Sequence, residues 1–209
     1  MTAKEFVFKF WYFGIPIVVL LLVGFWLLVK RYTKEEQISI GKSFSVIVTR
    51  VGDGDGFKAM HTPWFRSKQI FDKKGKVQKN LPLLSFRLAG VDAPEVAAFG
   101  KPAQPFAKES TDFLKFLILY RVVQVKIVGK DMYGRLLAMV YTGGFFNKKN
   151  VNDLMLKTGM ACVYVGAHAK YGGRLAQMKA LEKEAKANRL GMWSSKNVVT
   201  PMEHKAKYR

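Results

Sequence analysis

The sequence predicts an α+β fold: a small closed β-barrel of five short strands with about three helices, preceded by one N-terminal transmembrane helix. Three observations support this prediction. Short segments of alternating apolar and polar residues recur between residues 43 and 141, helical periodicity dominates residues 174–188, and residues 10–29 contain no charged side chain. The 209-residue chain is long enough for one such domain with an anchor and a tail.

The apolar block Phe10–Val29 predicts a membrane anchor. About 20 apolar residues cross the hydrocarbon core of a bilayer as a helix, and the sequence that follows, KRYTKEEQ, lacks the small residues of a cleavage site. We therefore expect an N-terminal segment 1–9, a single-pass anchor at 10–29 that contacts membrane lipid, and a linker at 30–42. The flanking basic residues differ too little in number to fix the orientation.

Short strands are expected from residue 43 onward. The run FSVIVT at 44–49 alternates along its length, GDGDG at 52–56 turns the chain, and residues 57–60 return. Further strands are expected at 85–91, 122–128 and 136–141. Pro94 ends the third of these five strands because it cannot donate to a ladder. Residues 61–82 show no period and carry six basic side chains against Asp72 alone, which predicts an exposed basic loop.

Three helices are expected beside the strands. They are predicted at 103–119, 151–158 and 174–188. The last has the clearest pattern, because Leu175, Met178 and Leu181 share one face at helical spacing. Residues 196–209 are predicted to be a basic C-terminal tail, whose end, HKAKYR at 204–209, is solvated.

Charge restricts the partners of this chain. Lysine and arginine number 35 against 15 acids, a formal charge of +20 that favours nucleic acid or an anionic membrane surface. The single cysteine, Cys162, excludes an intrachain disulfide and a cysteine-rich zinc site, and is expected to be a buried apolar residue. No feature indicates a protein partner.

Three turns combine acids with a basic residue. GDGDG carries Asp53 and Asp55, VDAPE carries Asp92 and Glu95 shortly after Arg87, and KDMYGR carries Asp131 and Arg135. Each turn has a plain structural alternative. Asp and Gly commonly form turns without any ligand. Arg87 could be a structural arginine within its strand, and Arg135 could simply cap a hairpin.

Together and in this order, the motifs resemble the thermonuclease family, the staphylococcal-nuclease-like domains. The resemblance covers residues 43–195 and rests on VGDGD at 51–55, FRLAGVDAPE at 86–95, DMYGRLLAMVY at 131–141, VNDLMLKTGMACVY at 151–164 and NRLGMWS at 188–194. The extended form RLAGVDAPEVAAFGKPAQPF behind an anchor is most similar to the membrane-anchored probable endonucleases of that family. The resemblance implies an OB-type five-stranded barrel with three helices.

The resemblance also implies roles for individual residues. Arg87, Glu95 and Arg135 match the catalytic positions, while Asp55, Asp92 and the backbone carbonyl of Ala93 match the metal ligands. Gly56 and Ala93 stand where the family often has Thr. The implied cofactor is Ca²⁺.

The residue types suit hydrolysis of a phosphodiester. Carboxylates at Asp55 and Asp92, without His or Cys beside them, favour a hard cation such as Ca²⁺ or Mg²⁺ over zinc. Glu95 is placed to take a proton from the attacking water. Arg87 and Arg135 can donate paired hydrogen bonds to phosphoryl oxygens as negative charge builds.

Further substrate contacts are expected from two segments. Tyr133 matches a family position beside the substrate phosphate, with packing of the hairpin as an equal alternative. Lys73, Lys74 and Lys76 are expected to contact phosphates near the site, because their loop directly follows the Asp55 hairpin.

Three functions stay open at this point. The motifs favour a membrane-anchored, calcium-dependent endonuclease acting on DNA and/or RNA. The alternatives are a tethered nucleic-acid-binding module without catalysis and an adaptor for anionic lipid. Phosphate contacts do not distinguish DNA from RNA. A single-pass membrane location follows from the anchor, and a mitochondrial one from the resemblance alone.

Overall fold

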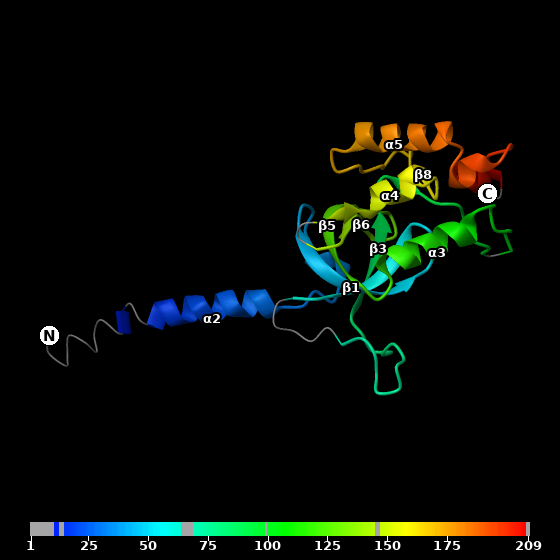
Figure 1. The fold of residues 1–209 in the computed structure, drawn as a ribbon. Helices are drawn as coiled ribbons and strands as arrows, with labels where there is room; N and C mark the ends of the chain where they lie inside the picture. The colour runs from blue at the N-terminus through cyan, green and yellow to red at the C-terminus, as the bar shows by residue number, and fades with distance from the viewer. Residues whose placement is uncertain (1–10, 13–14, 64–68, 99, 145–146, 208–209) are drawn as a thin grey trace.

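Four antiparallel pairings and one parallel pairing close five strands into a barrel. The computed structural model describes residues 11–12, 15–63, 69–98, 100–144 and 147–207. The barrel strands are β1 (Ser43–Val51), β2 (Gly56–His61), β3 (Leu83–Leu88), β5 (Val122–Lys130) and β6 (Leu136–Thr142). Their order is β3-β2-β1-β5-β6, and a parallel pairing of β3 with β6 closes the ring (Figure 1). The predicted five-stranded barrel is confirmed. A short strand β7 (Lys149–Asn150) extends β6 at one side.

Alternation along the strands fills the barrel with apolar side chains. In β5 the side chains of Val123, Val125 and Ile127 are buried, whereas Gln124 and Lys126 between them are exposed. This period of two is the pattern that identified the strand in the sequence.

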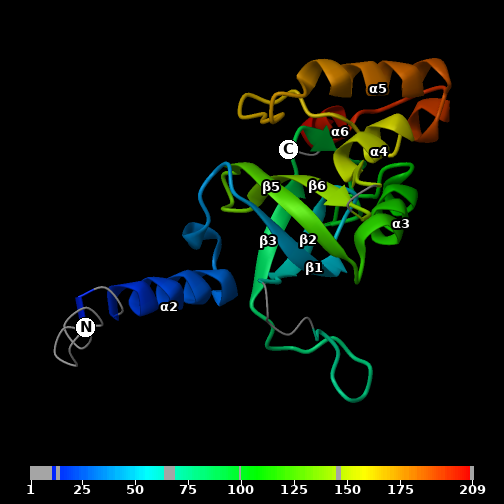
Figure 2. The same cartoon turned by 60° about the vertical axis from the view of Figure 1, so that its left-hand side comes forward.

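Four helices accompany the barrel in the described part of the chain. They are α3 (Ala107–Ile118), α4 (Val151–Lys157), α5 (Leu175–Ala187) and α6 (Pro201–Lys207), with a 3₁₀ turn at Gly191–Ser194. Both views place α4 and α5 over one end of the barrel (Figures 1 and 2). Helix α3 begins four residues later than predicted from position 103, because Pro105 restricts the backbone before it and Phe106 adopts a φ of 66°.

The predicted third strand, 85–91, is broken in two. β3 ends at Leu88, and Gly90 turns the chain with a φ of 70°, a conformation that glycine adopts freely. The chain then forms β4 (Val91–Asp92), which pairs with β8 (Cys162–Val163) outside the barrel sheet. This pairing ties the segment that carries Asp92 to the chain that follows α4.

The apolar block predicted as an anchor is helical over part of its length. Helix α2 spans Ile15–Val29, and the part of the block at residues 10 and 13–14 falls outside the described residues. From Ile15 to Trp26 the side chains are exposed, and the helix extends away from the barrel (Figure 1). None of the helices described here combines the length and the apolar character needed to cross a membrane.

Residues 30–42, expected to be a linker, pack against the barrel. Tyr32 stacks on His61 with ring centroids 4.6 Å apart, and Ile38 belongs to the core. A 3₁₀ turn at Glu35–Gln37 brings the Glu35 carboxylate within 2.7 Å of the backbone N–H of Ser85, which donates to it. Of the apolar side chains in this polar stretch, Ile38 is removed from water, whereas Ile40 stays exposed.

The basic loop leaves the barrel at the end opposite to the β1–β2 turn. β2 begins at that turn with Gly56 and runs six residues to His61, about 18 Å of extended chain. Both views show the loop projecting beyond the far end of the strand (Figures 1 and 2). The structure therefore does not bring Lys73, Lys74 and Lys76 to the turn, because the intervening strand carries their loop away from it.

Candidate active site

Two buried carboxylates meet one arginine at the end of the barrel where β1 turns into β2. Asp55 belongs to that turn, Asp92 to β4 and Arg87 to the end of β3. Nη2 of Arg87 donates to Asp55 Oδ2 at 2.8 Å and to Asp92 Oδ1 at 2.7 Å. The two acids are only 6% and 2% exposed. Two segments of the sequence, the turn of Asp55 and the stretch from Arg87 to Asp92, thus meet in one charged cluster.

Burial and pairing change the acid–base properties of this cluster. Burial raises the pKa of Asp55 to about 7, against the opposing pull of the Arg87 guanidinium. Burial also acts against the charge on Arg87, but the neighbouring carboxylates of Asp55 and Asp92 outweigh it and raise the pKa of this side chain. The guanidinium therefore stays charged, and it offsets part of the repulsion between two acids held close together.

Glycines shape the turn that carries Asp55. A Cβ on Gly54 would collide with the Ser110 hydroxyl of α3 and would lie 2.6 Å from Cβ of Ala93. A Cβ on Gly56 would lie 2.7 Å from Oδ1 of Asp53. The turn can thus pack directly on α3 and on the residue after Asp92 only with glycine at position 54. At position 56, where the family often has Thr, the missing side chain leaves room for the Asp53 carboxylate.

Glu95 reaches the cluster through a lysine of the C-terminal helix. Lys205 Nζ lies 2.9 Å from Asp92 Oδ1 and 2.8 Å from Glu95 Oε1. Burial acts against the charge on Lys205, but Asp92 and Glu95 outweigh it and raise the pKa of the ammonium group. The prediction of a solvated end at 204–209 is wrong for Lys205, because α6 buries Pro201 and places Lys205 between two acids.

Gln104 fixes the backbone of Glu95. Its side-chain Oε1 accepts from the Glu95 N–H at 2.7 Å, and its own N–H donates to the Glu95 carbonyl at 2.9 Å. Its Nε2 donates to the carbonyl of Val199 at 3.2 Å, just before α6. The buried amide of Gln104 therefore links the segment of Glu95 to the segment that carries Lys205.

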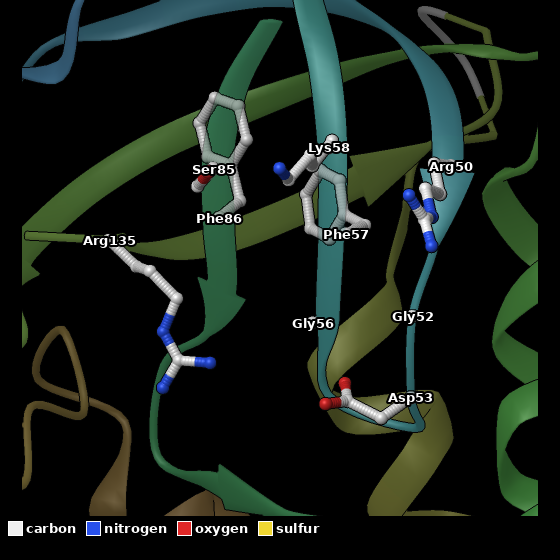
Figure 3. A pocket seen from close by; sticks show the side chains of 9 residues that line it. All are labelled: Arg50, Gly52, Asp53, Gly56, Phe57, Lys58, Ser85, Phe86 and Arg135. Carbon is white, nitrogen blue, oxygen red and sulfur yellow. The ribbon is translucent and has the colours of Figure 1, made fainter. Parts of the chain in front are cut away.

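Arg135 lies beside the cluster without contacting its carboxylates. Its Nε donates to Asp131 Oδ2 at 2.6 Å within the same hairpin. The exposed ring of Tyr133 lies under its guanidinium, 5.6 Å from ring centroid to Cζ. Arg135 precedes Leu136, the partner of Phe86 in this parallel pairing, and so lies near the strand position of Ser85, two residues before Arg87. The Nε of Arg135 thus caps the hairpin, as the structural alternative expected, while the side chain also lines a neighbouring pocket (Figure 3).

That pocket has a volume of about 310 Å³ and lies on the outer surface of β1, β2 and β3. Its polar side chains include Arg50, Asp53, Lys58, Ser85 and Arg135. Figure 3 shows the three basic side chains around the opening and the Asp53 carboxylate at one end. Asp53 belongs to the same turn as Asp55, so the pocket adjoins the acidic cluster.

The residues at the cluster fit a hard cation in their donor chemistry. Among the described residues, no three His, Cys, Asp or Glu side chains are grouped as a metal site. Asp55 and Asp92 nevertheless offer oxygen donors alone, of the kind that Ca²⁺ and Mg²⁺ accept. The ammonium of Lys205 in contact with Asp92 and Glu95 indicates that a cation is accommodated at this point.

Three neighbours of the site had no signal in the sequence. Lys205 looked like one charge of a basic tail, and Gln104 like a polar residue between prolines. Tyr164 holds its ring 5.5 Å from Cζ of Arg87, a contact across the fold that no local pattern indicates. Cys162 is buried as predicted, and its thiol donates to the Asp92 carbonyl at 3.4 Å.

A closed five-stranded barrel with an arginine and carboxylates gathered at one end defines a protein of the thermonuclease class. Comparison with protein families agrees, since the family described as staphylococcal nuclease homologue matches residues 85–195. The chain belongs to this family.

Similar proteins carry the word endonuclease in their names. The chain is 43% identical over 171 residues to "Probable endonuclease lcl3" of Sclerotinia sclerotiorum, covering 77% of this chain and 64% of that protein. It is 37% identical over 178 residues to "Endonuclease Htp3" of Saprolegnia parasitica, covering 85% of this chain and 81% of that protein. A "Probable endonuclease LCL3" of Candida albicans is 39% identical over 191 residues, covering 84% of this chain and 81% of that protein. The chain thus spans less than two thirds of the Sclerotinia protein.

Proposed function

We propose that this protein is a metal-dependent endonuclease that hydrolyses phosphodiester bonds of DNA and/or RNA. The observation that carries the proposal is the Arg87 guanidinium between Asp55 and Asp92, with Glu95 joined to Asp92 through Lys205. Family membership and the names of the similar proteins support the same chemistry. The charge of +20 suits a polyanionic substrate.

Each residue has a distinct task in this proposal. Glu95, about one third exposed at its side chain, takes the proton of the attacking water. Arg87 and Arg135 donate to the phosphoryl oxygens, where charge grows in the transition state. Tyr133, exposed beneath Arg135, contacts the substrate phosphate. A guanidinium serves here better than an ammonium, because its planar fork matches two oxygens at once.

Ca²⁺ is the proposed cofactor, with Mg²⁺ as the alternative. Nucleases of this family generally depend on calcium. Asp55, Asp92 and the backbone carbonyl of Ala93 would hold the ion, whose charge would screen the phosphate. The buried position of both carboxylates strengthens their attraction for a cation, since water screens charges less there.

A cleavage assay on the purified chain tests the function directly. We expect Ca²⁺ to support cleavage of a fluorescent oligonucleotide, a chelator to stop it, and Glu95→Gln to slow it by about 10² to 10⁴ while oligonucleotide binding persists. Binding by the parent chain without cleavage, over a range of Ca²⁺ and Mg²⁺ concentrations, would instead support a nucleic-acid-binding module.

We further propose that residues 10–29 attach the protein to a membrane as a single-pass anchor, in mitochondria by analogy with the family members it resembles. The support is the charge-free sequence of this block and the exposure of the α2 side chains from Ile15 to Trp26. Carbonate extraction of membranes from expressing cells tests the attachment. Release of the protein into the carbonate supernatant would contradict it.

A further inference from the structure

We propose that the pocket beside the acidic cluster is a subsite for a second phosphate of the substrate strand. Its ligand would be the phosphodiester backbone next to the bond that is cleaved. This inference rests on the proposed nuclease function, and it extends the site beyond Arg87, Glu95 and Arg135.

The first support is the position of two basic side chains on neighbouring strands. Arg50 in β1 and Lys58 in β2 are directly paired in the register of the sheet. A shift of register between Val48 and Arg50 in β1 precedes this pair. Such a bulge re-aims side chains, and Arg50 is exposed while its neighbours Thr49 and Val51 are buried.

The second support is that neither basic side chain is paired with an acid in the described part of the chain. Like charges at directly opposite positions of two strands destabilise a sheet. In the described part of the chain, neither the Arg50 guanidinium nor the Lys58 ammonium forms an ion pair. A bound phosphate would relieve this repulsion with charge-assisted hydrogen bonds.

The third support is continuity with the site. Lys58 is opposite Ser85 and Gly56 is opposite Arg87 in the same strand pairing. Arg135 lines the pocket on its other side, across from Arg50 (Figure 3). A strand whose scissile phosphate meets Arg87 and Arg135 can therefore continue over Ser85 toward Lys58 and Arg50. Figure 3 shows the Asp53 carboxylate at one end of the pocket, apart from the Arg50 and Lys58 side chains.

The salt dependence of binding tests this subsite. The probe is a fluorescent single-stranded oligonucleotide in buffer with a chelator, which prevents metal-dependent cleavage. For the double variant Arg50→Gln/Lys58→Gln, we expect the slope of log K against log salt to fall by about 1.4, since each phosphate contact contributes about 0.7. The matched control is Lys73→Gln/Lys74→Gln, which removes the same charge at the far end of the barrel and should keep the parent slope.

An unchanged slope in the Arg50/Lys58 variant, or an equal fall in the control, would overturn the subsite. A failure of the proposed function is distinguishable from this result. It would appear as a parent chain that does not cleave the oligonucleotide with Ca²⁺, whatever the slope of either variant.

A different observation carries a second inference, which concerns the C-terminal helix. We infer that Lys205 competes with the metal ion for Asp92 and so sets the affinity of the site for Ca²⁺. The ammonium lies 2.9 Å from Asp92 Oδ1, and 2.8 Å from Glu95 Oε1. An ion bound by Asp92 would face this positive charge within a few ångströms, and repulsion would weaken its binding.

Calorimetric titration of the full chain with Ca²⁺ tests this second inference without any activity measurement. Lys205→Met should lower the dissociation constant for Ca²⁺ by about three- to tenfold, while Lys205→Arg should keep the parent value because it keeps the charge. Lys196→Met, which removes an exposed charge from the same terminal region, is the control and should change nothing. An unchanged or larger dissociation constant for Lys205→Met would overturn the inference, since it would make Lys205 a support for Asp92 instead.

Discussion

Glu95 and Gln104 are joined by two reciprocal hydrogen bonds, one of them through the Gln104 side chain. Gln104 Oε1 accepts from the Glu95 N–H at 2.7 Å, and the Gln104 N–H donates to the Glu95 carbonyl at 2.9 Å. The buried amide leaves the chain at Glu95 little freedom, although the carboxylate itself is partly exposed. A general base needs this precision, because misplacement by about 1 Å can cost about 100-fold in rate.

Replacing Gln104 with Met should therefore lower both stability and rate. The change leaves the Glu95 N–H without its acceptor, which should reduce the free energy of unfolding by about 1 to 3 kcal/mol. We expect kcat to fall while KM changes little, since substrate contacts remain. Urea unfolding and steady-state kinetics measure the two effects. Gln78→Met, in the loop at the far end of the barrel, is the control and should leave kcat unchanged.

The charged residues of the site should respond differently to substitution. Glu95→Gln keeps the shape of the side chain and should lose about 10² to 10⁴ in rate while substrate binding persists. Asp92→Asn should weaken the metal site, so that part of its lost activity returns at high Ca²⁺. Arg135→Ala should be slow at every Ca²⁺ concentration, because it removes a transition-state donor.

Rate measurements across a Ca²⁺ titration compare these three variants. Full activity of Glu95→Gln at saturating Ca²⁺ would contradict its role as the base. Rescue of Arg135→Ala by Ca²⁺ would indicate that Arg135 supports metal binding and does not act as a transition-state donor.

Gly54 should tolerate no side chain. In Gly54→Ala the added methyl group would collide with Ser110 and Ala93, so the turn must move away from α3. We expect a loss of about 1 to 3 kcal/mol in unfolding free energy, as overpacking typically causes, and weaker binding of metal by the displaced Asp55. Gly52→Ala is the matched control, because nothing lies within 4 Å of its added methyl group. Equal thermal unfolding of the two variants would refute the packing of the turn on α3.

His61 should make stability depend on pH between about 4 and 6.5. Burial, followed by the charges of Arg31 and Lys42, lowers the pKa of His61 to about 4 from 6.5. Between these two pKa values the unfolded chain is protonated at His61 and the folded chain is not. The stability contributed by neutral His61 is therefore fully present above pH 6.5 and is lost as pH falls toward 4. The loss attributable to His61 should reach about 3 kcal/mol.

Urea unfolding at a series of pH values checks this expectation. His61→Gln should show a flatter decline than the parent across that window, and the exposed His168→Gln should match the parent. A decline of the same steepness in His61→Gln would assign the pH dependence to other groups.

Two N-terminal deletions should separate the apolar block from the fold. Removal of residues 1–29 should leave a folded, active nuclease, because every site residue lies in the barrel or beyond it. Removal of residues 1–38 also takes Tyr32 and the buried Ile38, and should lower the unfolding free energy by about 2 to 5 kcal/mol. Thermal unfolding compares the two, and equal midpoints would show that residues 30–38 contribute nothing to the core.

The barrel could be predicted because its strands alternate locally. Val123, Val125 and Ile127 show the period of two in the sequence and are buried in the structure. The cluster of Arg87 with Asp55 and Asp92 was predicted only by resemblance to a family, because two separate stretches of the chain had to be brought together. The sequence of each turn by itself does not predict that these side chains lie together.

The position of Lys205 and that of the basic loop depend on contacts between distant parts of the chain, which local sequence patterns do not reveal. Lys205 meets Asp92 across 113 positions of sequence, and a lysine in a basic tail has no feature that reveals its partner. The basic loop was expected near the site because it follows the Asp55 hairpin. Proximity along the chain was misleading there, since a strand of six residues carries the chain to the opposite end of the barrel.

The direction of β1 sets the distance between the N-terminal segment and the acidic turn. β1 starts at Ser43, next to the N-terminal segment, and ends at Val51 just before the acidic turn. Nine residues of strand span about 30 Å. A molecule held by its first residues on a surface would therefore present its carboxylates on the outward side, roughly one barrel height above the point of attachment. Nucleic acid could then be cleaved at this distance from the surface, without contacting the surface itself.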